Sequence, residues 1–200
     1  MQWHENPTMK HAILIGLVLG WITLIRPVDL VFGLIFLVYG IYSVQSYKEK
    51  LNLLLNKWKQ VLVMGLGICA VFSIQMFYWK YSTGQWFYWS YTDEGFHFLK
   101  PHIWEGLFGF RKGWYIYTPL MLVATAGFFF ISRYEKKFTL AFVLTWLFFT
   151  YVIFSWWCWW YGGGISARPY IDLYAIMGIA LACLLQWVWD QKKLFYIIPC

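Results

Sequence analysis

Apolar residues in this chain gather into long continuous runs instead of alternating with polar residues. Each run is long enough, or nearly so, to cross the hydrocarbon core of a bilayer. An unpaired backbone amide in lipid costs several kcal/mol, so every run is expected to be helical. The runs lie at about 12–25, 30–45, 61–79, 114–131, 138–154 and 173–189, and a further run begins at 194–198. The sequence therefore predicts an all-α polytopic transmembrane helical bundle of about six spans with a truncated seventh.

Composition supports this membrane interpretation. Hydrophobic residues make up 61% of the chain and charged residues 12%, whereas soluble domains carry roughly 25% charged residues. The first two runs are short and are separated by Arg26-Pro27-Val28-Asp29, so they are either two tilted spans or a pair of partly inserted helices. We expect residues 1–200 to form a single transmembrane domain and to be a fragment of a longer protein, because the chain stops within an apolar run.

The positions of lysine and arginine predict the orientation. With the N-terminus inside and every run a full crossing, ten cations fall on the inner side and six on the outer side. The inner set is Lys10, Lys48, Lys50, Lys57, Lys59, Arg133, Lys136, Lys137, Lys192 and Lys193, and the outer set is Arg26, Lys80, Lys100, Arg111, Lys112 and Arg168. This bias follows the positive-inside rule and places loops 80–113 and 155–172 outside. The net charge of +7 is therefore mostly a topology signal, not a nucleic-acid-binding face.

The junction Arg26-Pro27-Val28-Asp29 has two interpretations. A charge at mid-bilayer costs roughly 2.5–3.5 kcal/mol, so this segment should lie between two helices. Pro27 suits the first position of a new helix, and Arg26 and Asp29 then complement the dipoles of the flanking helices. Either the junction is a capped hairpin with an internal ion pair, or Arg26 holds a phosphate.

The outer loop 80–113 carries a candidate acidic site. Asp93-Glu94, with His97 and His102, resembles a catalytic set, although adjacent acids in a loop are weak support for that role. The two histidines lack the spacing of a zinc-binding helix, and the four cysteines show no CxxC spacing, so no metal site is predicted.

The same loop holds an aromatic segment and a pair of cations. The aromatic residues of 86–91 are typical of an interfacial belt, or they stack against sugar rings. Arg111 and Lys112 immediately precede an apolar run, at headgroup depth. They either anchor the helix by snorkelling or contact an anionic ligand.

The second outer loop reads WWCWWYGGGISARPYIDLYA over 156–175. The spacing of Trp156, Trp159 and Trp160 predicts one aromatic helical face at the end of the fifth span. Three glycines then break the run, and Pro169 favours a new helix start. Backbone amides at that start, next to Arg168, are expected to bind an anion. The alternative is an ion pair between Arg168 and Asp172.

Three stretches together resemble a known family: LGWITLIRPVDL, SYTDEGFHFLKPHIWEGLFGFRKGWYIYTPLM and WWYGGGISARPYIDLYA. Their order and spacing, over roughly Lys10 to Gln186, are similar to polytopic glycosyltransferases of the GT-C type. Within that type the chain most resembles bacterial enzymes related to the dolichyl-phosphate-mannose protein mannosyltransferases. The resemblance implies transfer of a sugar from a polyprenyl phosphate to an acceptor on the outer face of the bacterial cytoplasmic (inner) membrane, with an unknown acceptor and no cofactor firmly implied.

The resemblance also implies roles for individual residues. Outer-face cations would hold the lipid phosphate, with Arg168 first, followed by Arg26, Arg111 and Lys112. The residues that would line the sugar or prenyl site are Trp160, Tyr161, Asp93 and Glu94. The catalytic acid of the family lies in an outer loop upstream of the matched region. No acid here occupies that position, so the catalytic residue stays unknown, and the fragment alone is expected to be inactive.

Two other functions stay open at this point. A transporter or flippase for lipid-linked sugars would also need cations and aromatic residues at the membrane surface. Transporters tend to carry ionisable or helix-breaking residues at mid-bilayer in repeated halves. The runs after residue 60 lack internal charge and no repeat is visible, which favours the transferase. The third possibility is a non-catalytic membrane scaffold.

Overall fold

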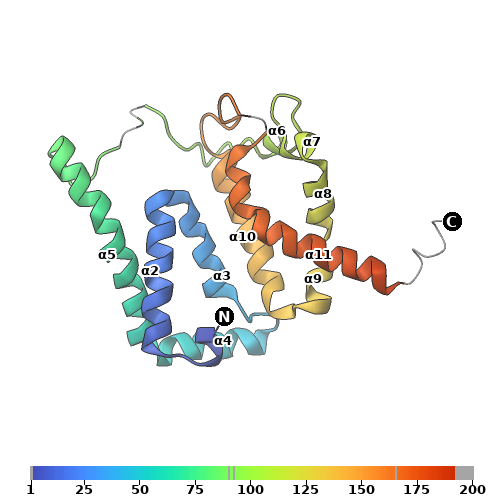
Figure 1. Ribbon diagram of the computed structural model, residues 1–200, viewed down its shortest axis with the longest axis horizontal. Helices are drawn as coiled ribbons and strands as arrows, with labels where there is room; N and C mark the ends of the chain where they lie inside the picture. The colour runs from blue at the N-terminus through green and yellow to red at the C-terminus, as the bar shows by residue number, and fades with distance from the viewer. Residues whose placement is uncertain (1, 90, 92, 165, 192–200) are drawn as a thin grey trace. The chain divides into compact units, whose positions relative to one another are not determined.

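The computed structural model describes residues 2–89, 91, 93–164 and 166–191 (Figure 1). Over these residues the chain is helical, and β pairing is limited to an isolated antiparallel bridge between Phe96 and Trp156. The predicted all-helical fold is thus confirmed for the described part of the chain. The run at 194–198 lies outside the described residues. The chain divides into two compact units, Met1–Gly95 and Phe96–Cys200.

The first unit has helix ends that its sequence specifies. Its elements are α1 (Gln2–Glu5), α2 (Met9–Ile25), η1 (Pro27–Phe32), α3 (Gly33–Val38), α4 (Val44–Asn56) and α5 (Trp58–Thr83). The Thr8 hydroxyl accepts the His11 N–H at 3.3 Å and so caps α2. Ser43 and Ser46 cap α4 reciprocally. Gly84 ends α5 in the left-handed conformation (φ 77°), which costs glycine little.

Helices α2 and α5 pack along each other in the same direction through small residues. A Cβ atom on Gly16 would lie 2.5 Å from the Met64 carbonyl oxygen. One turn further along, a Cβ atom on Gly20 would lie 2.8 Å from the Val71 Cβ. Gly67 faces Gly16 from α5 in the same way. Small residues at such spacing let helix backbones approach closely, which is the main source of helix association in lipid.

The first predicted run is observed as a helix, but the second differs from what the sequence indicated. Helix α2 ends at Ile25, Arg26 is its C-cap, and Pro27 opens η1, as expected. Asp29 lies in the first turn of η1 and is buried. The segment 30–45 is not one helix, because it begins as 3₁₀ turns and α3 already ends at Val38. Both α2 and the η1–α3 segment are apolar but shorter than a typical membrane span.

A buried lysine joins three elements of the first unit. The Lys50 side chain comes from α4, is only 6% exposed, and donates to the Phe36 carbonyl at 2.8 Å. Its Nζ also contacts His4 Nε2 and lies 5.1 Å from the centre of the Phe36 ring. Trp3 packs on the same ring, and its indole donates to Gln60 at 2.7 Å. Burial lowers the pKa of Lys50 to about 8.

This shift predicts a pH dependence of stability. The unfolded chain keeps Lys50 protonated up to about pH 10.4, while the folded chain releases the proton near pH 8. The unfolded state therefore binds more protons in this window, so the free energy of unfolding rises as pH increases through it. We expect the thermal unfolding midpoint of the purified protein in micelles, followed by tryptophan fluorescence, to rise over this window.

Lys50→Met should abolish that rise, and Lys48→Met should retain it, since Lys48 is exposed. An equal rise in the Lys50→Met protein would show that another group is responsible.

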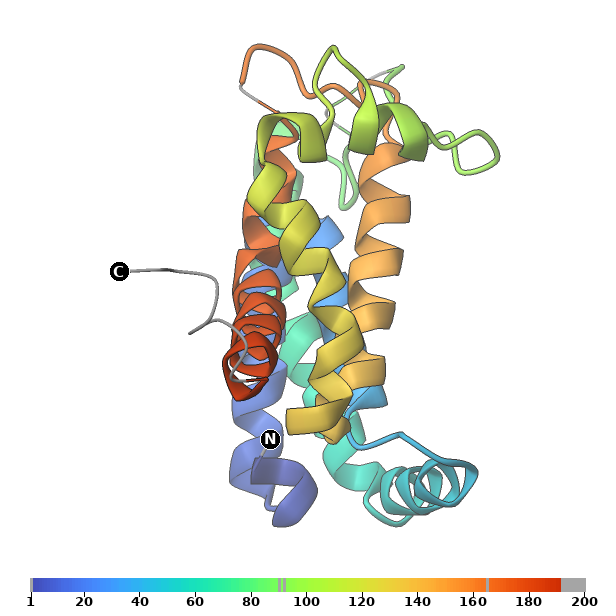
Figure 2. The ribbon, with the colours of Figure 1, turned by 90° about the vertical axis from the view of Figure 1, so that its right-hand side faces the viewer.

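In the second unit two long helices pack against shorter ones. Its elements are α6 (Ile103–Phe108), α7 (Trp114–Tyr117), α8 (Pro119–Ala126), α9 (Phe128–Tyr134), α10 (Lys136–Phe154), η2 (Arg168–Leu173) and α11 (Tyr174–Asp190). Helix α11 contacts both α8 and α9, and α10 contacts α9 (Figure 2). The core contains fully buried Phe149, Phe154, Tyr170, Leu173 and Met177.

The predicted span 114–131 is a broken column of three short helices. Pro119 starts α8, and the residue before a proline disfavours the helical conformation, so α7 ends at Tyr117. A second break falls at Gly127, whose missing side chain leaves room for α11. A Cβ atom on Gly127 would lie 2.1 Å from the Ala180 carbonyl oxygen.

Three helical segments in the described residues are long and apolar enough to cross a membrane: Trp58–Thr83, Lys136–Phe154 and Arg168–Asp190. In α5 only 11% of the most apolar stretch is buried by the protein. Large side chains such as Leu62, Leu66 and Phe77 are therefore exposed on it. Such a surface is stable in hydrocarbon but not in water.

Candidate functional site

Two loops meet at one end of the second unit, and a lysine joins them. Lys112, which precedes α7, donates hydrogen bonds to the backbone carbonyls of Gly162 and Gly164. The two loops are about fifty residues apart in sequence and lie at the same end of α10 (Figure 2). Lys112 thus fixes the glycine-rich loop by two of its three N–H donors.

The neighbouring arginine lies against an aromatic face. The Arg111 guanidinium carbon is 4.0 Å from the centre of the Trp160 ring. At this distance the ring face attracts the cation and holds its plane. Arg111 is exposed, and stacking on a ring face leaves the N–H groups of a guanidinium edge able to donate.

The glycine-rich loop between α10 and η2 has a constrained backbone. Tyr161 and Gly162 both have positive φ, 51° and 63°, and so does Ser166, at 56°. A positive φ is costly for a residue with a side chain, and at Tyr161 a contact offsets that cost. The Tyr161 hydroxyl donates to the Ile153 carbonyl at 2.6 Å, which ties the loop to the last turn of α10.

Arg168 follows this loop and is the first residue of η2. Its side chain is exposed, while its neighbours Ala167 and Pro169 are buried. Its Cβ would lie 3.9 Å from a Cβ placed on Gly164, whose carbonyl Lys112 binds. Within the described part of the chain the Arg168 guanidinium makes no hydrogen bond or ion pair, so the alternative in which it pairs with Asp172 is not seen there. The structure therefore gathers Arg111, Lys112 and Arg168 at one loop pair.

The backbone amides at this helix start differ from the prediction. The Arg168 N–H bonds to the Ser166 carbonyl at 3.1 Å, and the Tyr170 N–H bonds to the Ala167 carbonyl at 3.0 Å. Pro169 has no N–H. The first-turn amides are therefore already used, and any anion here depends on the cationic side chains instead.

The predicted helical tryptophan face is also wrong. Helix α10 ends at Phe154, and residues 157–160 form turns, because the chain must leave the helix to reach the glycines. Trp159 instead stacks on His102, with ring centres 5.8 Å apart, and Trp160 packs edge-on against Trp159. Trp157, Trp159 and Trp160 thus form a cluster of ring contacts, not one stripe on a helix.

A buried aromatic layer beneath the loops was not apparent from the sequence. Tyr170 is fully buried, with its ring centre 4.1 Å from that of Trp114 and 5.3 Å from that of Phe154. Phe154 in turn occupies the space next to Gly106, where a Cβ atom would lie 2.2 Å from its ring. The glycine in IWEGLF was the only sequence signal for this contact. The layer supports η2 and with it the position of Arg168.

The remaining predicted residues are divided between the two units. Arg26, Asp93 and Glu94 belong to the first unit, so their membership of one site with Arg168 stays a prediction. Trp89 donates to the Glu94 carbonyl at 3.0 Å, which is a local turn contact. His102 is 3.9 Å from Glu105. No group of three or more potential metal ligands occurs among the residues that the structure describes.

The chain matches no protein-family model, no curated protein sequence and no solved structure.

Proposed function

We propose that this chain is part of an integral membrane glycosyltransferase that transfers a sugar from a polyprenyl-phosphate donor at the outer membrane surface. The observation that carries the proposal is the grouping of Arg111, Lys112 and Arg168 at the end of α10 and the start of η2. Three cations and a tryptophan cluster at the end of membrane-length helices suit an anionic, lipid-borne group.

The three cations have different tasks in this proposal. Lys112 is a positioning residue, because two of its donors hold the glycine-rich loop. Arg111 presents one edge of its stacked guanidinium. Arg168 has its full set of donors available and binds the phosphate directly.

The chemistry of transfer explains why cations are needed. Cleaving the bond between sugar and phosphate leaves an additional negative charge on the prenyl phosphate. A preorganised cation at that position lowers the barrier by stabilising the developing charge. The acceptor hydroxyl needs a base, which is a task separate from that of the cations. The resemblance of the sequence to GT-C enzymes supports this separation between the cations that bind phosphate and the base that acts on the acceptor.

The first test measures ligand binding. The protein is reconstituted in lipid nanodiscs and titrated with a polyprenyl phosphate or with the corresponding polyprenol. Wild type should prefer the phosphate, and Arg168→Ala should weaken phosphate binding about tenfold or more, the equivalent of one lost charge-assisted hydrogen bond. Polyprenol binding should stay unchanged.

Arg133→Ala is the matched control, since Arg133 is exposed in the last turn of α9, away from the two loops. It should bind the phosphate as wild type does. Equal affinity of wild type for polyprenol and polyprenyl phosphate would contradict the proposal. A transfer assay with a polyprenyl-phosphate sugar, in membranes containing the full-length protein, then separates a transferase from a flippase.

A further inference from the structure

Helix α4 presents three different faces along its length. It runs across the ends of α2 and α5 in the first unit, not beside them (Figure 1). One face is directed inward, where Ser46 and Lys50 are buried and Leu53 packs against the cluster around Trp3 and Phe36. A second face is polar and exposed, and it carries Gln45, Glu49, Asn52 and Asn56.

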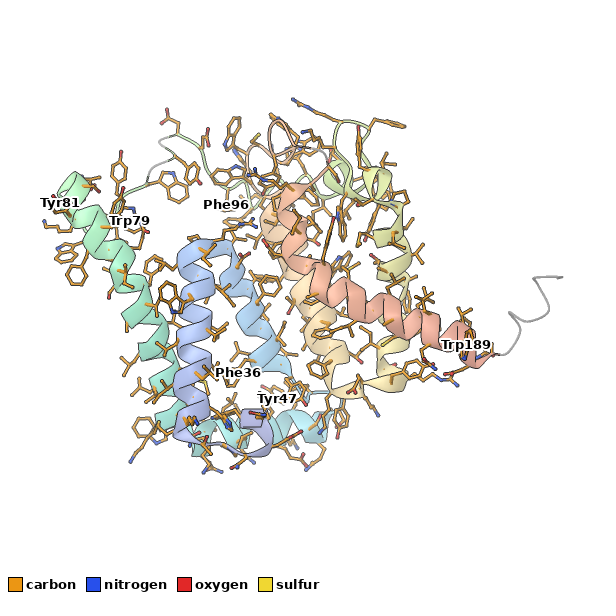
Figure 3. All side chains as sticks on the ribbon, viewed as in Figure 1. Phe36, Tyr47, Trp79, Tyr81, Phe96 and Trp189 are labelled. Carbon is orange, nitrogen blue, oxygen red and sulfur yellow. The ribbon has the colours of Figure 1, made fainter. Side chains whose placement is uncertain are left out.

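The third face is apolar and is exposed within the first unit. It consists of Val44, Tyr47, Leu51 and Leu55, which follow one another at steps of three and four residues and therefore form one stripe. Their exposed fractions lie between 44% and 74%. Figure 3 labels Tyr47 on this stripe and Phe36 in the core. In water such a stripe is a liability, so it indicates a surface that is covered in the native setting.

Cations border this apolar stripe. Lys48 lies four residues after Val44 and three before Leu51, so it is directly beside the stripe and exposed. Trp58 follows at the start of α5, with Lys59 Nζ 5.9 Å from its ring centre. Long basic side chains and amphipathic aromatic rings around an apolar stripe are the composition of helices that lie in a membrane interface.

The location of α4 agrees with this composition. A single residue, Lys57, joins its end to the first turn of α5, which is long and apolar enough to cross a membrane. The end of a crossing helix lies at the bilayer surface, so α4 is held at that surface. A helix there with one face on protein, one apolar and one polar fits the boundary between headgroups and acyl chains.

We propose that α4 is an interfacial helix that docks on an anionic lipid leaflet, with the stripe Val44, Tyr47, Leu51 and Leu55 in the acyl boundary and Lys48 and Lys59 on lipid phosphates. A leaflet fits better than a second copy of the chain. A symmetric dimer through this stripe would place the same cations of both copies in one interface. Anionic lipid instead supplies the opposite charge.

The test compares neighbouring positions on α4. In a protein whose native cysteines are replaced by serine, spin labels are placed at Leu51→Cys or Asn52→Cys, and the protein is reconstituted in vesicles containing phosphatidylglycerol. The label at 51 should collide with oxygen several-fold more than with a water-soluble nickel chelate, and the label at 52 should show the reverse. High nickel accessibility at 51, or shielding from both reagents, would overturn the proposal.

A second measurement tests the charge preference. A fluorophore at Leu55→Cys is quenched by brominated phosphatidylglycerol or brominated phosphatidylcholine. Quenching should favour the anionic lipid, and each of Lys48→Gln and Lys59→Gln should reduce that preference about fivefold, as expected for one lysine near an anionic surface. Lys137→Gln, at the start of α10, is the control and should leave it unchanged. Equal quenching by both lipids in the unsubstituted protein would refute the anionic partner.

Discussion

Gly16→Leu should separate α2 from α5 and lower the free energy of unfolding of the first unit by about 3 kcal/mol, the upper part of the usual range for overpacking. The added Cβ atom would lie 2.5 Å from the Met64 carbonyl oxygen and 2.9 Å from its Cα. These are backbone atoms, so no side chain can rotate away to make room. The two helices must move apart, and the contacts of Gly20 and Gly67 are lost with them.

Gly65→Leu is the control for that substitution. Gly65 lies beside Met64 on α5, yet nothing stands within 4 Å of a Cβ atom placed on it. Leucine favours a helix over glycine at either position, so the two variants differ in the contact and not in propensity. Unfolding of the purified protein by increasing SDS in mixed micelles measures both. An equal loss in the two variants would mean that the α2–α5 contact contributes little.

Gly127→Val should be similarly costly for the second unit, again by about 3 kcal/mol. Its Cβ atom would lie 2.1 Å from the Ala180 carbonyl oxygen and 2.8 Å from the Ala124 carbonyl oxygen. Helix α11 must then shift away from α8 and α9. Since α11 continues directly from η2, the shift also moves Arg168. We therefore expect both a lower SDS midpoint and weaker binding of a polyprenyl phosphate.

Gly178→Val provides the comparison, because Gly178 lies on the same helix α11 with nothing within 4 Å of its Cβ position. It should keep the midpoint and the phosphate affinity of wild type within measurement error. If Gly127→Val retained both, the proposed coupling between helix packing and the position of Arg168 would be wrong.

Local features of the fold could be read from the sequence where the physics is local. The helix junction at Arg26 and Pro27 was predicted correctly, since a proline ring has a fixed φ and lacks an N–H wherever it occurs. Pro119 likewise marks a break in the predicted span 114–131. The span was predicted to be continuous because hydropathy does not depend on whether the backbone is broken. The early end of α3 at Val38 was missed for the same reason.

The candidate site was predictable only in part. Arg111, Lys112 and Arg168 were visible as cations flanking apolar runs, because a charge is costly at mid-bilayer and therefore marks where a run leaves the membrane. That Lys112 binds the carbonyls of Gly162 and Gly164 was not visible. Every residue carries a carbonyl, so the sequence does not distinguish the acceptor. For the same reason the sequence did not show that the Arg168 and Tyr170 amides donate to the carbonyls of Ser166 and Ala167.

The sequence by itself determined that this chain is helical and apolar enough for a membrane, and which positions carry its cations. Those properties follow from the transfer free energy of each side chain, which needs no partner. Only the tertiary structure decided which backbones approach at Gly16 and Gly127 and which loops Lys112 joins. It also decided which apolar stripe of α4 the first unit leaves exposed. These outcomes depend on distances between residues far apart in the chain, and the order of residues along the chain does not give those distances.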